Sequence, residues 1–229
     1  MLKLKVITGI IIGATMLTSV PAFAKPAESP THYTVTNPKK WDYNTEDYKD
    51  CIVVSEISGK DAIVYEIRAN KKEKEEDKDK EKKDEKMSVD LEFARDPDTG
   101  EKIPLTELGE RKDGRGVFNS KYGQKITEIR LLTKADLFKI NENAFRGSHI
   151  ERIVIKCKKV LFKTGAFKKT LAPDIQLVFD TADQIEAEKG AFEGLDSITL
   201  ICEKAEESEK AKDYLTTFFD GKIEIGSLE

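Results

Sequence analysis

Histidine is scarce in this sequence: among 229 residues only His32 and His149 occur, far apart in the chain. Nucleophile elbows, P-loops, Rossmann glycine turns and His-Glu metal motifs are missing altogether. A carboxylate pair could lie among the 43 acidic residues, but the sequence singles out none of them. We therefore expect no catalytic residue, no cofactor and no metal site. An extracellular hydrolase without a recognisable motif is the less favoured alternative.

An excess of positive charge is also missing, because 39 Lys and Arg residues stand against 43 Asp and Glu residues. Binding to nucleic acid calls for a basic patch, so nucleic acid is not an expected partner. A mildly acidic chain is soluble and repels its own copies. We expect a monomer.

Long apolar runs are lacking too. The most prominent run, "VITGIIIGATMLTSV", has about 15 residues, and a membrane-spanning helix needs roughly 20. It follows Lys3 and Lys5 and is followed by small residues at Ala22 and Ala24, which is the pattern of a secretory signal peptide. We expect residues 1–24 to be cleaved off before Lys25. The protein should then be secreted or attached to the cell surface without a transmembrane segment; an uncleaved anchor helix is the alternative.

The first part of the mature chain, residues 25–124, is expected to be an N-terminal β-region. "CIVVSEI" and "AIVYEIRA", separated by "SGKD", predict a hairpin, and "SVDLEFA" predicts a third strand. Residues 71–86 are all charged and have nothing to bury, so they predict a mobile loop. Residues 103–124 are polar and rich in glycine, and we interpret them as a connection with one degenerate turn at Val117 and Phe118.

The second part, residues 125–229, contains an Ala-Phe pair three times, ending at Phe145, Phe167 and Phe192. Four β-type runs align at steps of 24, 22 and 23 residues on Ile129, Ile153, Ile175 and Ile198. One strand and one returning segment in every 20 to 30 residues are typical of a solenoid, whose small units share one core.

Alternate residues of a strand point to the same side, so the repeat predicts which side chains form the core. The expected core consists of inward strand residues and the phenylalanine of each pair: Ile129, Leu131, Phe145, Ile153, Ile155, Phe167, Ile175, Leu177, Phe192, Ile198 and Leu200.

The pattern I-x-x-I-x-L followed by I-x-x-x-A-F resembles the BspA-like leucine-rich repeats of bacterial surface and secreted proteins. "ITEIRLL…KINENAFRGS" and "IERIVIK…LFKTGAFKK" carry the resemblance best. The third unit departs from it: "IEAEKGAF" has two extra residues, and the Cys and Pro that the family often has after the strand are missing there. The resemblance implies a mainly β fold with short helical or irregular returns, a small leucine-rich-repeat solenoid, and a role in surface binding and adhesion.

The C-terminal segment also resembles that family's ending. A helix containing Tyr214, Leu215, Phe218 and Phe219 is expected to lead to a last strand at Ile223 and Ile225. Together they would cap the solenoid.

The outward residues of the repeat strands form the candidate binding face: Arg130, Leu132, Val154, Lys156, Gln176, Val178, Thr199 and Ile201. Four of these are apolar where a solvated face prefers polar residues, which suggests that a partner covers them. Alternatively, the N-terminal β-region or the chain's own loops cover them. The sequence thus predicts a non-enzymatic protein that binds an extracellular protein or glycan; a structural role in the cell envelope is the alternative.

Cysteine is rare, with three residues at Cys51, Cys157 and Cys202. In the register above, the last two lie two repeats apart, or roughly 9 to 10 Å at the usual strand spacing. A disulfide tolerates about 7 Å at most between Cα atoms. We expect Cys157 and Cys202 to be free, buried and packed like small apolar residues.

Overall fold

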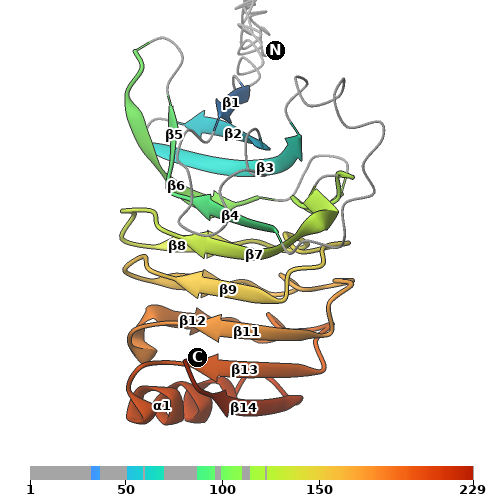
Figure 1. The fold of residues 1–229 in the computed structure, drawn as a ribbon, viewed down its shortest axis with the longest axis vertical. Helices are drawn as coiled ribbons and strands as arrows, with labels where there is room; N and C mark the ends of the chain where they lie inside the picture. Colours follow the sequence, from blue (N-terminus) through green and yellow to red (C-terminus); the bar gives the residue numbers. More distant parts are fainter. Residues whose placement is uncertain are drawn as a thin grey trace, which may run out of the picture.

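The structure, a computed structural model, describes residues 32–36, 51–58, 60–69, 87–95, 99–109, 114–121 and 123–228. The expected signal peptide and the charged run at 71–86 lie outside these residues. Within them the chain forms two sheets, drawn in Figure 1.

The first sheet has six strands, all of them parallel. Its order is β14 (Lys222–Gly226), β13 (Ser197–Ile201), β11 (Asp174–Val178), β9 (Arg152–Ile155), β7 (Ile126–Leu131) and β4 (Met87–Leu91).

The second sheet has eight strands. Its order is β1 (His32–Thr36), β2 (Cys51–Ser58), β3 (Asp61–Ala69), β6 (Lys102–Leu108), β8 (Phe138–Ile140), β10 (Val160–Phe162) and β12 (Ile185–Ala187), with β5 (Phe93–Arg95) also paired to β6. From β3 to β12 the pairing is parallel, while β1, β2 and β3 pair antiparallel, as β5 does with β6.

The predicted fold class, a mainly β leucine-rich-repeat solenoid with helical or irregular returns, is wrong. The described residues form two multi-stranded sheets, largely parallel, and a single α-helix, which is an α/β-type arrangement. The returning segments contain β8, β10 and β12, and these strands build most of the parallel part of the second sheet. They are strands because their residues alternate between buried and half-buried, which matches the period of two.

Both sheets continue across the boundary expected near residue 125. β4 pairs with β7, and β6 pairs with β8. The predicted hairpin is confirmed as β2 and β3, but "SVDLEFA" divides into β4 and β5, which pair with different partners. Residues 103–108, expected to belong to a connection, form most of β6 (Lys102–Leu108), because Ile103, Leu105 and Leu108 are buried in the core.

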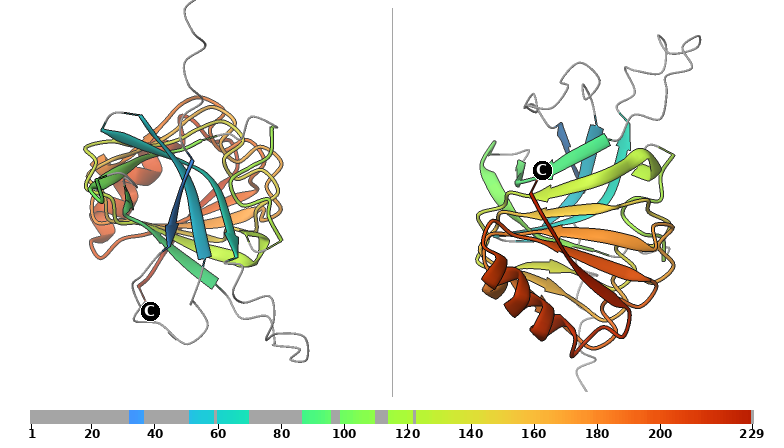
Figure 2. Two further views of the ribbon diagram at one scale, coloured as in Figure 1. Left: turned by 90° about the horizontal axis from the view of Figure 1, so that it is seen from above. Right: turned by 60° about the horizontal axis from the view of Figure 1, so that its bottom comes forward.

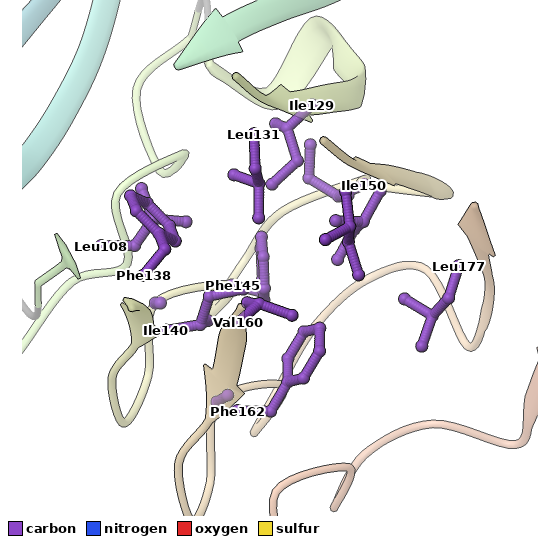
Figure 3. Close-up of a cluster of buried hydrophobic side chains, with 14 of the residues drawn as sticks. Leu108, Ile129, Leu131, Phe138, Ile140, Phe145, Ile150, Val160, Phe162 and Leu177 are labelled. Carbon is purple, nitrogen blue, oxygen red and sulfur yellow. The ribbon is translucent and has the colours of Figure 1, made fainter. Parts of the chain in front are cut away.

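The core lies between the two sheets. In Figure 3, the side chains of Leu108, Phe138 and Ile140 come from the eight-stranded sheet. Those of Ile129, Leu131 and Leu177 come from the six-stranded sheet and belong to the same buried cluster. All eleven residues expected in the core are buried, with at most 1% of each exposed. Apolar side chains from both sheets thus share one core.

The phenylalanines of the Ala-Phe pairs form a continuous row of rings. Centroid distances are 4.6 Å between Phe145 and Phe167 and 5.7 Å between Phe167 and Phe192. Phe118 extends the row, 5.7 Å from Phe145. The alanines allow close approach, since the Phe145 N–H donates to the Ala166 carbonyl at 3.0 Å. The recurring pair therefore links each return to the next through both backbone and ring.

The strand register differs from the expected alignment at one step. Ile129 pairs with Ile153, and Ile175 pairs with Ile198, as expected. Ile153, however, pairs with Leu177 rather than Ile175. A shift of two residues leaves every side chain on the same face, so the assignment of inward and outward residues is unchanged.

The six-stranded sheet ends at β14, next to helix α1 (Ala205–Leu215), at the end opposite the N-terminal strands (Figures 1 and 2). Leu215 is fully buried in the core, and Ala187 N–H donates to the Tyr214 hydroxyl at 3.1 Å. Phe218 and Phe219, expected inside the helix, lie beyond its end.

Cys157 and Cys202 are free thiols, and both are buried. The Cys202 thiol donates to the Asp180 carbonyl at 3.2 Å, and the Cys157 thiol contacts the Lys159 carbonyl at 3.6 Å. Burial raises the pKa of Cys157 from its ordinary value of 9.0 to about 11.

We predict that Cys157 reacts slowly with thiol reagents in the folded protein. Because the thiolate is the nucleophile, a pKa of about 11 lowers its reactive fraction at pH 8 roughly a hundredfold. In a Cys51→Ser background, iodoacetamide should label residues 157 and 202 rapidly only after denaturation without reductant. A mapped bridge between them, or equally fast labelling of the native protein, would contradict the burial of these thiols.

Candidate functional site

The eight outward residues expected from the sequence come together on the outer face of the six-stranded sheet. Arg130, Val154, Val178 and Ile201 form one row across β7, β9, β11 and β13. We call these four residues the central row. It continues to Asp90 of β4 on one side and to Gly226 of β14 on the other.

The remaining four candidates lie on either side of the central row. Gln176 and Thr199 belong to a neighbouring row that also contains Glu128 and Arg152. Leu132 and Lys156 follow the ends of β7 and β9, where their N–H groups continue the ladder by donating to the carbonyls of Leu91 and Leu131. The face is therefore a single surface built from the outward residues of adjacent strands.

Pairs across adjacent strands, and one pair within β7, hold the polar side chains of this face in position. Lys156 Nζ lies 2.7 Å from Asp180 Oδ1, and Arg152 Nη1 donates to Gln176 Oε1 at 3.2 Å. Glu128 accepts a hydrogen bond from Arg130 Nε at 3.0 Å, and its other oxygen lies 3.5 Å from Arg152 Nε. These pairs are partly exposed, so each contributes less than about 1 kcal/mol to stability. Their effect is to orient the charges.

The expected exposed apolar stripe is only partly present. Val178 and Ile201 are 7% and 5% exposed, although neither belongs to the core cluster between the sheets. Leu132 and Val154 are half-buried. The exposed apolar part of this face is therefore smaller than the sequence suggests.

Neighbours on the same face account for this burial. Val178 lies between Val154 and Ile201 in the ladder, and adjacent strands bring such side chains into contact. Ile201 leans over Gly226, where an added Cβ would lie 3.1 Å from Ile201 Cγ1. Among the described strands of the N-terminal β-region, β1, β2 and β3 extend the other sheet and do not cover this stripe.

We predict that Val178→Ser lowers the free energy of unfolding by about 1–2 kcal/mol, because it places a hydroxyl at a buried apolar position. Gln176→Ser, on the exposed neighbouring row, is the matched control and should cost less than about 0.5 kcal/mol. Urea unfolding of both variants measures the difference. Equal, near-zero costs would show that Val178 is open to solvent.

Sequence reasoning missed Glu128, Arg152 and Asp180, which complete the polar flanks. The sequence could have indicated that they lie on this face, because each is two residues away from a residue of the central row. Alternate residues of a strand point to the same side. Without the register, however, the sequence does not indicate that Lys156 meets Asp180.

Other expectations concern metals and membranes. Among the described residues, no group of His, Cys, Asp and Glu is arranged to hold a metal ion. His149 is exposed beside a turn. In the same part of the chain, no helix is long and apolar enough to cross a membrane.

Comparison of the sequence with models of known protein families gives no match, and neither curated proteins nor solved structures match the chain. The resemblance to BspA-like proteins stays a hypothesis drawn from the sequence.

Proposed function

We propose that the protein is a non-enzymatic binding protein that works outside the cell or at its surface. The outer face of the six-stranded sheet would contact an extracellular protein, as in adhesion. The N-terminal sequence pattern supports export, as the basic start, short apolar run and small residues before Lys25 are typical of a secretory signal.

The observation that carries the proposal is the order of side chains on this face. Apolar Val154, Val178 and Ile201 run through its middle, and paired charged and amide groups lie on both sides. A less polar centre with a polar rim is the usual anatomy of a protein interface. A protein partner would cover Leu132 and Val154 and replace water at the rim.

The positive charges at the rim provide a direct test. In the variant Arg152→Glu/Lys156→Glu, capture of partner proteins from an extracellular or matrix extract should fall by at least about tenfold, since reversed rim charges repel a complementary surface. Lys189→Glu is the matched control, because Lys189 is exposed on a return segment away from this face. Capture by the control should equal that of the parent protein.

Two outcomes would contradict the proposal. Equal capture by the double variant and the parent would place binding elsewhere. Sedimentation with peptidoglycan in high salt, without capture of any protein, would favour a structural role in the cell envelope.

Export is tested separately by mass spectrometry of protein from the culture medium. The expected N-terminus is Lys25. Full-length protein retained in the cytoplasm would contradict the extracellular part of the proposal.

A further inference from the structure

A groove of about 380 Å³ lies on the outer face of the eight-stranded sheet. It is separate from the six-stranded face, and its side chains come from β3, β6 and the segments that follow β8, β10 and β12. Its volume lies within the range of small-ligand sites, about 300 to 1,000 Å³.

One row of the sheet explains where the groove forms. The last paired residues of five adjacent strands lie side by side, and the residue after each of them continues the row. These following residues are Tyr65, Gly109, Asn141, Lys163 and Glu188. Backbone hydrogen bonds continue the ladder at these positions, including Gly109 N–H to Val64 at 2.8 Å and Lys163 N–H to Ile140 at 2.9 Å. Gly109 contributes no side chain, so the side chains of neighbouring residues can lie over its backbone.

The glycine also lets an apolar wall form. A Cβ at residue 109 would lie 2.7 Å from both Ile63 Cγ2 and Tyr65 Cε1. The side chains of Ile63 and Tyr65 therefore lie against the Gly109 backbone. They give the groove one apolar and aromatic side.

The rest of the groove's lining is polar and held in place. Glu107 accepts hydrogen bonds from Lys139 Nζ at 2.8 Å and from Asn141 Nδ2 at 2.9 Å. Burial alone would raise the pKa of Glu107, but these two hydrogen bonds and the nearby charges of Lys139 and Lys163 lower it. Glu107 is thus ionised and fixed, and Asn141 keeps its amide oxygen for a ligand.

A second carboxylate is fixed in a similar way. Glu188 accepts from the Thr164 N–H at 3.0 Å and from the Thr164 hydroxyl at 3.2 Å. The hydrogen bond from the Thr164 N–H has the largest effect on the pKa of Glu188 and lowers it. The Thr164 hydroxyl and the charge of Lys163 lower this pKa further, while partial burial raises it. Glu142 is exposed and also lines the groove. Its side chain lies next to Gly165, where an added Cβ would be 3.2 Å from Glu142 Cγ.

We propose that this groove binds a neutral carbohydrate of one or two sugar rings. A sugar has one face rich in C–H groups and a rim of hydroxyls that both donate and accept hydrogen bonds. Ile63 and Tyr65 would contact the C–H face of the sugar. The carboxylate and amide oxygens and the Lys163 ammonium would form hydrogen bonds with its hydroxyls. Because the polar groups are already oriented, little side-chain entropy is lost on binding.

Charge selects against an anionic ligand. Glu107, Glu142 and Glu188 repel an anionic ligand such as a phosphate or a uronic acid. Lys163 lies close enough to lower the pKa of both Glu107 and Glu188, and Lys139 pairs with Glu107, so these two carboxylates are balanced without a cationic ligand. A neutral hydroxyl-bearing ligand avoids the repulsion that an anion meets.

The test uses the full-length protein and three matched sugars: glucose, glucosamine and glucuronic acid, followed by cellobiose, maltose and N,N′-diacetylchitobiose. NMR titration should show saturable shifts of the Gly109, Thr164 and Gly165 amides with at least one neutral sugar, at a Kd of about 1 mM or tighter. Neutral sugars should bind better than the cationic and anionic analogues.

Variants assign the binding to the groove. Glu142→Ala, at an exposed position, and Tyr65→Leu should each weaken sugar binding about tenfold or more, which corresponds to the loss of one good contact. Glu193→Ala is the control, because Glu193 is exposed and does not line the groove. If Tyr65→Leu fails to fold, Glu142→Ala and Lys163→Gln still decide the question.

Several results would overturn this proposal: no shift with any sugar, preferential binding of glucosamine or glucuronic acid, or unchanged binding by the groove variants. The groove variants leave the six-stranded face intact, and Arg152→Glu/Lys156→Glu leaves the groove intact. Failure of carbohydrate binding is therefore distinguishable from failure of the proposed protein interface.

Discussion

Phe167→Ala should lower the free energy of unfolding by about 3–5 kcal/mol, a large part of the roughly 5 to 15 kcal/mol that stabilises a typical domain. The Phe167 ring is fully buried and contacts rings on both sides, with centroids 4.6 Å from Phe145 and 5.7 Å from Phe192. It also lies 5.9 Å from Phe162 of β10. Removal leaves a cavity that the surrounding strands fill only in part.

Leu171→Ala is the control for this prediction, because Leu171 is nearby in sequence but 53% exposed. It should change stability by less than about 0.5 kcal/mol. Urea unfolding measures both values, and hydrogen exchange should show faster opening of the returns on both sides of residue 167. A Phe167→Ala variant that unfolds like the parent would refute the continuous ring row.

Gly116→Ala should be nearly as damaging, at about 3 kcal/mol, because it overpacks a backbone contact. A Cβ at this position would overlap the Arg146 carbonyl oxygen and would lie 2.8 Å from the Arg146 nitrogen. Backbone atoms cannot rotate away as a side chain can. The shift would strain the adjacent hydrogen bond from the Val117 N–H to the Ala144 carbonyl, now 3.0 Å long.

Gly100→Ala separates the steric effect from the conformational cost of losing a glycine. Gly100 has a φ of +72°, but an added Cβ would meet no described atom within 4 Å. Only the left-handed backbone would be strained, at about 1 kcal/mol. The melting temperature of Gly116→Ala should therefore be well below that of Gly100→Ala. The reverse order would show that residues 114–118 do not lie against the 143–146 turn.

The sequence predicted the buried positions of the repeat strands well because strand periodicity depends only on alternate residues. Ile153 and Leu177 were both assigned inward, and both are fully buried. Their mutual pairing was missed, since a shift of two residues preserves that alternation. Periodicity determines the face, while the register also depends on how the returns pack.

The second sheet was harder to predict. β8, β10 and β12 have three residues each, too few for an alternating pattern to stand out. In β6, Lys102, Pro104 and Glu107 obscure the alternation of Ile103 and Leu105, which are buried.

The two candidate sites differ in the same way. The alternation of residues along each strand is enough to predict which side chains lie on the outer face of the six-stranded sheet. It does not predict that Val178 and Ile201 are buried there. The groove could not be inferred, because it needs the pairing that brings Tyr65, Gly109 and Lys163 together from distant parts of the chain.

Hydrogen exchange of the complex with the captured protein partner tests the central claim, that the outer face of the six-stranded sheet is the binding surface. We predict slower exchange in residues 128–132, 152–156, 176–180 and 199–203, with the groove around Gly109 and Thr164 unchanged. Slower exchange confined to the return segments or to helix α1, with β7, β9, β11 and β13 unaffected, would contradict the claim.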